Sequence, residues 1–261
     1  MEEKLYEAAM VGGAKEVEDI LQTTPDINLQ WLCTGFIGRS ALHIACSNGH
    51  DSVVNLLLAH HAINVNAKNS LGEVAFCEAA VAGRTACVAL LVKDGRAVIT
   101  ERNVDGFTPL CWAAFCGHLG VAKWILAAGE PEVEEVGEIV AAIGIARRKG
   151  KAPVLGLLRR FQEDMVATRS SLWGELEYGD NVAAGIFALV VFHCDGLLEI
   201  PESKGRISGS VRFFFMARKL PLELQMVLCY RLVGSMKNIV AGRDGEVAFR
   251  KLAGRLGRSE T

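Results

Sequence analysis

The stretch Asp105-Gly-Phe-Thr-Pro-Leu-Cys-Trp-Ala-Ala-Phe-Cys-Gly-His118 predicts a turn followed by a short helix. The Asp-Gly pair that opens it favours a tight turn, because glycine adopts the positive φ that such turns need. Thr108 can cap a helix, and Pro109 at its first position gives up only an N–H that would have no partner there. Gly117 ends that helix, and apolar residues from Val121 onward recur at the spacing of a second one.

The same pattern returns at intervals of 34 residues. One interval before Thr108 lies Val74-Ala-Phe-Cys77, and one interval before that lies Ser40-Ala-Leu-His43. Asn64-Val-Asn-Ala67 closes the earlier copy. A unit of two short helices and a turn cannot bury its apolar face alone, so such units stack on one another.

The residues on either side of these three copies fit the pattern more loosely. Residues 3–22 carry two short helical patterns without a preceding turn motif. Residues 139–162 keep the apolar spacing, but the acidic run 130–138 replaces the turn before them, and charged residues stud the helices. We therefore expect a stack of five units over residues 3–162, whose first and last members are degenerate end caps.

These residues resemble the ankyrin repeat, whose signature is D-x-x-G-x-T-P-L-H-x-A-A-x-x-G-H-x-x-V-V-x-L-L-L. The copy that contains His43 follows it most closely, whereas Cys77 and Cys111 replace the signature histidine. The resemblance implies an all-α ankyrin repeat solenoid of helix-turn-helix units with short β-hairpin loops. It places an ankyrin repeat domain of about five repeats in residues 1–162.

The 34-residue period is lost in residues 163–261. Their apolar segments, bounded by glycine and proline, predict a C-terminal α-helical domain, a bundle of about five helices. The longest apolar run, residues 182–192, is too short to span a bilayer, which takes about 20 residues. We therefore expect no membrane-spanning segment.

Part of this region resembles an F-box. Leu220-Pro-Leu-Glu-Leu224, with Leu228 one turn later, matches the opening of that motif, and ankyrin repeats followed by such an element resemble the poxvirus-type PRANC arrangement. The resemblance implies a substrate adaptor of a cullin-type ubiquitin ligase, in which Leu220, Pro221, Leu224 and Leu228 dock a ligase subunit. The alternative is a helix that belongs only to the C-terminal bundle. A SOCS box fits less well, because its leucine and cysteine are one residue out of register here.

The sequence carries no pattern that indicates catalysis, a metal or a cofactor. His193, Cys194 and Asp195 are adjacent, so on a helix their side chains point apart. No C-x-x-C pair occurs, and no glycine-rich stretch has the spacing and the hydroxyl of a phosphate loop. The net charge of -2 gives no electrostatic indication of nucleic-acid binding.

The eight cysteines are expected to be free thiols, several of them buried where ankyrin stacks need small residues. The N-terminal residues do not have the pattern of a signal peptide. These observations predict a cytoplasmic or nuclear protein.

The remaining candidate for function is a surface. The ankyrin resemblance implies a concave groove formed by the loop tips and the inner face of each first helix. By register, its lining residues are Phe36, Ile37, Arg39, Ile44, Leu71, Glu73, Glu78, Phe107, Trp112 and Phe115.

Exposed aromatics with a charged rim are typical of protein-binding hot spots, and Arg39, Glu73 and Glu78 are the expected rim. The alternative for Ile44 and Phe115 is that they pack against neighbouring helices. We therefore predict a non-catalytic scaffold that binds a partner protein, whose identity the sequence does not reveal.

Overall fold

The computed structural model describes residues 1–35, 37–129, 133–178, 186–187, 225–226 and 229. The chain divides into two compact units, Met1–Arg169 and Ser170–Thr261. The described residues form eleven α-helices and no strand, which confirms the predicted all-α class.

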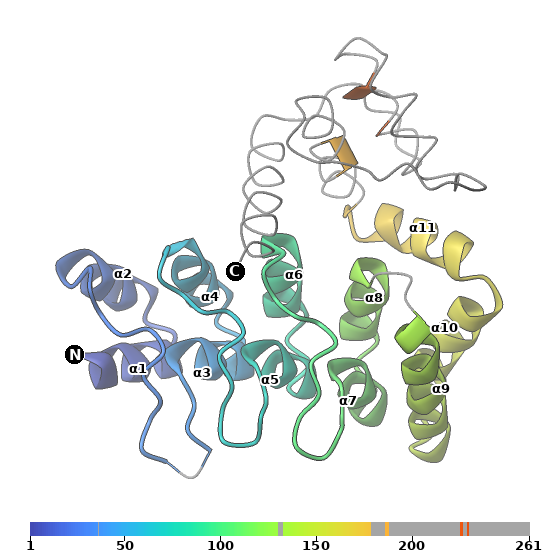
Figure 1. Ribbon diagram of the computed structural model, residues 1–261, viewed down its shortest axis with the longest axis horizontal. Helices are drawn as coiled ribbons and strands as arrows, with labels where there is room; N and C mark the ends of the chain where they lie inside the picture. The colour runs from blue at the N-terminus through green and yellow to red at the C-terminus, as the bar shows by residue number, and fades with distance from the viewer. Residues whose placement is uncertain (36, 130–132, 179–185, 188–224, 227–228, 230–261) are drawn as a thin grey trace, which may run out of the picture. The chain divides into compact units, whose positions relative to one another are not determined.

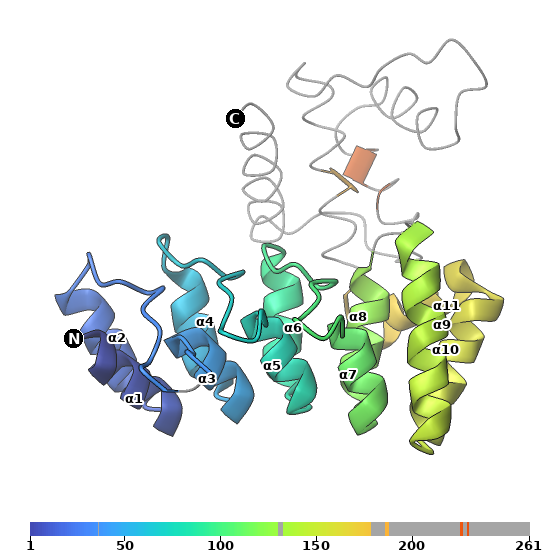
Figure 2. The ribbon, with the colours of Figure 1, turned by 60° about the horizontal axis from the view of Figure 1, so that its bottom comes forward.

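The first unit contains five pairs of helices. The two helices of each pair run antiparallel and form two rows (Figures 1 and 2). The first helices of the pairs are α1 (Glu2–Val11), α3 (Ala41–Asn48), α5 (Ala75–Val81), α7 (Pro109–Cys116) and α9 (Val133–Arg148). The second helices are α2 (Ala14–Thr23), α4 (Asp51–Ala59), α6 (Thr85–Asp94), α8 (Leu119–Ala128) and α10 (Ala152–Glu163), and α11 (Met165–Glu175) follows them. Each helix packs against its partner in the pair and against the equivalent helix of the adjoining pairs.

The helix boundaries follow the local sequence. The side chains of Ser40 and Thr108 each accept a hydrogen bond from the backbone N–H three residues on, at 3.5 and 3.3 Å. Val74 stands at the same position before α5 and provides no side-chain cap. Gly49 and Gly117 end α3 and α7 with φ of 84° and 89°, values that side chains rarely adopt.

The core lies between the two rows. Small residues line the helix contacts, while fully buried larger side chains such as Leu42, Leu57 and Phe76 fill the space between pairs. Each such side chain contributes about 2 kcal/mol by leaving water. The predicted buried thiols are confirmed: Cys46, Cys77, Cys87 and Cys111 are buried and unbridged.

Side chains at the start of the second helices join each pair to the one before it. Each donates to a carbonyl near the end of the preceding first helix: His50 Nε2 to Met10 O at 3.0 Å, Arg84 Nε to Ser47 O at 3.0 Å, and His118 Nε2 to Val81 O at 3.1 Å. These bonds cross every junction from the first pair to the fourth. They act together with the packing of equivalent helices to set the distance between repeats.

The loops before α5 and α7 reverse the chain as hairpins that are too short to contain strands. The backbone N–H of Asn69 donates to Glu73 O at 2.9 Å, and that of Asn103 donates to Phe107 O at 3.0 Å. Single backbone hydrogen bonds join neighbouring loop tips; for example, the N–H of Val104 donates to Leu71 O at 3.0 Å. The acidic run differs from expectation, because it is already helical from Val133 and so lengthens α9.

Candidate functional site

The first-helix row and its loops carry side chains at three positions that recur every 34 residues in the second, third and fourth repeats. One position precedes the N-cap, one lies within the first helix, and one lies near the end of that helix. We call these residues the inner face: Arg39, Glu73 and Phe107; Ile44, Glu78 and Trp112; Ser47, Val81 and Phe115. Along the row, the inner face changes from charged to aromatic.

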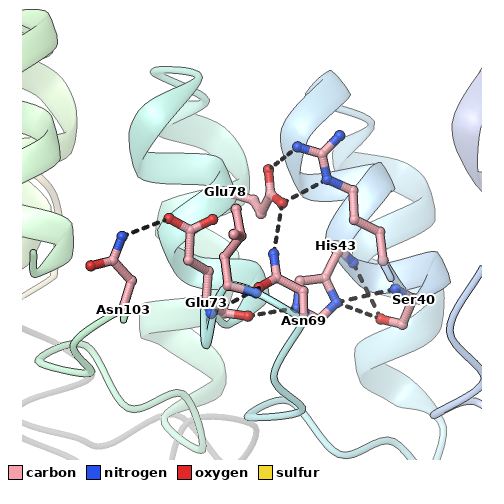
Figure 3. A network of polar contacts seen from close by, with 8 residues as sticks. Ser40, His43, Asn69, Glu73, Glu78 and Asn103 are labelled. Atoms are coloured by element: carbon pink, nitrogen blue, oxygen red, sulfur yellow. Dashed lines mark hydrogen bonds and ion pairs between the residues drawn. The ribbon is translucent and has the colours of Figure 1, made fainter. Parts of the chain in front are cut away.

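An ion pair on the inner face joins the second repeat to the third. Arg39 donates from Nε and Nη2 to the two carboxylate oxygens of Glu78, at 2.7 and 2.9 Å (Figure 3). Asn69 Nδ2 donates to the same carboxylate at 3.2 Å. The side chain of Glu78 is 6% exposed and that of Arg39 is 28% exposed. A carboxylate this buried depends on its donors, because an unpaired buried charge is strongly destabilising.

Two asparagines at equivalent positions, Asn69 and Asn103, stabilise the loops before α5 and α7. Asn69 Oδ1 accepts hydrogen bonds from the backbone N–H groups two and four residues on, both at 2.9 Å. Asn103 repeats the pattern at 3.1 and 2.9 Å. The amide of Asn103 also donates to Glu73 Oε1 at 3.1 Å, which links the third and fourth repeats (Figure 3). The polar contacts therefore form a chain across three repeats.

His43 provides a further bond between the second and third repeats. Its Nε2 lies 3.0 Å from Glu73 O, and because a carbonyl only accepts, Nε2 carries the proton. Its Nδ1 then accepts from Ser40, whose hydroxyl lies 2.7 Å away. Burial lowers the pKa of His43, since the charged imidazolium is disfavoured inside the protein. His43 is thus a neutral structural histidine.

An aromatic cluster forms the inner face of the fourth repeat. The ring centroids of Phe107 and Trp112 lie 5.1 Å apart, and those of Trp112 and Phe115 lie 5.8 Å apart in an edge-to-face arrangement. Phe115 is 37% exposed, and the other two rings are partly exposed. The indole N–H of Trp112 is covered and has no acceptor among the residues that the structure describes. We call Phe107, Trp112 and Phe115 the aromatic cluster.

Cations lie beside the aromatic cluster. Lys149 Nζ lies 4.1 Å from the centroid of the Phe115 ring, which is within the range of a cation–π contact. Lys149 directly follows α9, whose last turn carries the exposed side chains of Arg147 and Arg148. Helix α9 packs against α7, and Arg148 occupies the register position of Phe115 one repeat later. The aromatic end of the inner face is therefore positively charged.

A comparison with protein families identifies the fold. The sequence model described as ankyrin repeats (3 copies) matches residues 5–101 and also residues 42–135, which together span half of the chain. The chain belongs to the ankyrin repeat family. The ankyrin repeats form a protein–protein interaction domain, and the fold is typically a non-catalytic interaction module.

Individual ankyrin relatives match between 38% and 55% of the chain. The human SMC5-SMC6 complex localization factor protein 1 is 36% identical over 98 residues, which is 38% of this chain and 9% of that protein. The Escherichia coli ankyrin repeat protein YahD is 37% identical over 116 residues, 42% of this chain and 55% of that protein. A rice protein named as a probable E3 ubiquitin-protein ligase, XBOS31, is 30% identical over 143 residues, 55% of this chain and 31% of that protein. The chain thus spans at most about half the length of these curated relatives.

Three of the predicted groove residues are buried. Ile44 is 7% exposed, Glu73 is 8% exposed and Glu78 is 5% exposed. The expectation that the two glutamates form a charged rim is wrong, because their carboxylates are held by Asn103, Arg39 and Asn69 inside the repeat stack. The burial of Ile44 agrees with the alternative that it packs against neighbouring helices.

The other predicted groove residues divide between the loops and the aromatic cluster. Leu71 is 36% exposed at a loop tip, and Ile37 is partly exposed at the tip before it. Arg39 is partly exposed, and Phe36 lies outside the described residues. The structure brings the predicted Phe107, Trp112 and Phe115 together, whereas the two loop-tip residues belong to other repeats.

The structure adds residues that sequence reasoning missed. Asn69 and Asn103 stand 34 residues apart at the start of their loops, so the repeat period could have revealed them. Lys149 carries no such signal, because it contacts a ring in the preceding repeat.

Other predictions concern different parts of the chain. The predicted adaptor-docking residues Leu220, Pro221, Leu224 and Leu228 lie outside the described residues. Among the residues that are described, no group of three or more His, Cys, Asp or Glu side chains is placed to hold a metal ion. None of the helices described is long and apolar enough to cross a membrane.

Proposed function

We propose that this chain is a non-catalytic scaffold that binds a partner protein at the aromatic cluster of its inner face. The observation that carries the proposal is three partly exposed aromatic rings on one first helix and its loop, with Trp112 packed against both Phe107 and Phe115. Trp and other aromatic side chains dominate binding energy at protein interfaces, because they bury a large apolar area with little loss of side-chain freedom.

The polar chain beside the cluster supports the proposal. The bonds from Arg39 to Glu78 and from Asn103 to Glu73 fix three successive repeats relative to one another. A surface whose side chains are held before binding loses less entropy when a partner docks. Because Glu73 and Glu78 are buried and Glu78 is paired with Arg39, neither presents an exposed carboxylate that would repel an acidic segment.

The test is affinity capture from the native cell with a Phe107→Ala/Trp112→Ala variant. Loss of a hot-spot aromatic weakens binding by about 2 kcal/mol, or about thirtyfold, so partners recovered by the wild type should be depleted. The matched control is Tyr6→Ala/Trp31→Ala, which removes another aromatic pair (centroids 6.1 Å apart) from the first repeat and should leave recovery unchanged. Equal recovery of all partners by the cluster variant would refute the proposal, provided thermal unfolding shows that the variant is folded.

A second candidate is a part in ubiquitin ligation, as substrate adaptor of a cullin-type ligase. It is favoured by the F-box-like stretch and by two relatives: rice XBOS31, and the Arabidopsis protein named E3 ubiquitin-protein ligase KEG, which is 28% identical over 149 residues. Co-purification with a ligase linker subunit, lost in a Pro221→Ala/Leu224→Ala variant, would support this candidate. No co-purification with such a subunit would reject it.

A further inference from the structure

The charges around the aromatic cluster are mostly positive. Lys149 lies over the Phe115 ring, Arg147 and Arg148 are exposed in the adjoining turn, and Arg102 is exposed at the base of the loop that carries Phe107. Arg102 Nη1 donates to the carbonyl of Gly106, a neutral group, so its charge is not balanced there. The exposed Asp105 is the anion in this loop.

The carboxylates of Glu73, Glu78 and Glu138 are buried or lie away from these cations. Glu73 and Glu78 are buried, and Glu78 is already paired with Arg39. The glutamates of α9 stand at its beginning: Glu138 precedes Lys149 by eleven residues, or about 16 Å along a helix. Glu138 therefore lies well away from the end of α9 that carries these cations.

The aromatic rings and the cations lie next to one another on α7 and α9. The cluster runs from Phe107, just before α7, to Phe115 in its last turn, and the cations lie at the end of the adjoining α9. An extended peptide rises about 3.3 Å per residue, so a few residues lead from the rings to the cations.

We propose that the segment bound at the aromatic cluster is an acidic peptide. It places one bulky apolar side chain on Phe107, Trp112 and Phe115, and Asp or Glu side chains beside Lys149 and Arg148. The inference rests on the proposed function and adds the chemistry of the partner. Carboxylates suit these cations because they accept charge-assisted hydrogen bonds from lysine and arginine, and opposite charges speed and orient docking.

The experiment selects random peptides of about ten residues, which span about 33 Å when extended, on the intact wild-type chain. Selected peptides should carry one aromatic or large aliphatic residue and an excess of Asp and Glu over the starting library. Peptides that bind at the cluster but are neutral or basic would overturn the acidic assignment. If the selected peptides bind the Phe107→Ala/Trp112→Ala variant as tightly as the wild type, the proposed function fails instead, so the two failures are distinguishable.

A charge-reversal pair measures the electrostatic part directly. Fluorescence anisotropy of a selected peptide should show binding at least about fivefold weaker for Arg148→Glu/Lys149→Glu, because attraction at two exposed sites becomes repulsion. The matched control, Arg159→Glu/Arg160→Glu, makes the same change in charge on exposed residues of α10 and should bind like the wild type. Equal losses in both variants would mean that only net charge matters, which contradicts the proposal.

A nucleic acid is the competing anionic partner. A labelled single-stranded oligothymidylate should not bind the wild-type chain as tightly as the selected peptides do. Oligothymidylate binding of equal strength, lost in the Phe107→Ala/Trp112→Ala variant, would assign the cluster to base stacking and overturn the peptide proposal.

Discussion

The guanidinium of Arg39 holds the carboxylate of Glu78 at two points, 2.7 and 2.9 Å away, and these bonds join the second ankyrin repeat to the third. Glu78 stands at the register position that Trp112 occupies in the next repeat. The same position of the inner face is therefore a buried anchor between repeats in one unit and an aromatic surface in the next.

Removing Arg39 should destabilise the repeat domain. An Arg39→Ala variant leaves the buried carboxylate of Glu78 with Asn69 as its remaining donor, and we expect the free energy of unfolding to fall by about 2–3 kcal/mol. Urea denaturation measures this change. The control is Lys68→Ala, which breaks the more exposed pair between Lys68 and Glu101 and should cost less than about 1 kcal/mol. Equal losses in the two variants would contradict the structural role of the Arg39–Glu78 pair.

His43→Cys makes the substitution that the third and fourth repeats already carry. It removes the contacts of the imidazole with Ser40 and Glu73, and the free energy of unfolding should fall by about 1–2 kcal/mol at neutral pH.

The same variant should change the pH dependence of stability. Burial lowers the pKa of His43 below its ordinary value of 6.5, so below that value the unfolded chain binds a proton that the folded chain does not. The contribution of His43 is therefore complete above pH 6.5 and is lost as the pH falls. Urea midpoints at about pH 7.5 and 5.5 should converge between the wild type and His43→Cys on acidification. A constant difference between them would mean that His43 titrates as in the unfolded chain.

Substituting two glycines with positive φ distinguishes the cost of backbone strain from the cost of a steric clash. Gly83 has φ 70°, and a Cβ there would lie 2.6 Å from the His118 ring, whereas Gly106 has φ 79° and nothing within 4 Å. Either change to Ala strains the backbone by about 1 kcal/mol. Gly83→Ala should lose about 1 kcal/mol more, because His118 must give up its bond to Val81 O. Thermal unfolding compares the two variants, and equal stabilities would show that His118 adjusts freely.

The described thiols should differ in reactivity. Burial raises the pKa of the partly exposed Cys33, but hydrogen bonds from Gly35, Arg39 and Tyr6 lower it more. The pKa of Cys33 is therefore below its usual value, which increases its thiolate fraction. Burial raises the pKa of Cys77 to about 12. Peptide mapping after brief iodoacetamide treatment should find Cys33 alkylated well before Cys77, and the difference should vanish in urea. Equal rates in the folded chain would contradict the described burial.

The sequence was sufficient to predict the repeats, but not to predict which inner-face side chains are buried and which are exposed. Thr108 and Pro109 mark a helix start because capping depends on residues a few positions apart. The burial of Glu78 depends on Arg39, which lies 39 residues earlier, outside the 34-residue period. A contact between repeats that does not itself repeat leaves no periodic trace.

The aromatic cluster was predictable in part. The repeat register places Phe107, Trp112 and Phe115 on one face, and the rings do pack together. The cation over Phe115 was not predictable, because the repeat register places Lys149 near the end of its helix but does not show that its side chain lies over a ring of the preceding repeat.

Photo-crosslinking from the inner face tests the central claim most directly. A p-benzoylphenylalanine at position 115, where the native ring is 37% exposed, should crosslink a specific partner protein in the native cell. The control carries the same group at position 55, an exposed residue of α4 in the second-helix row. We predict an adduct from position 115 that position 55 does not give. The same adducts from both positions, or partner crosslinks from position 55 alone, would contradict binding at the aromatic cluster.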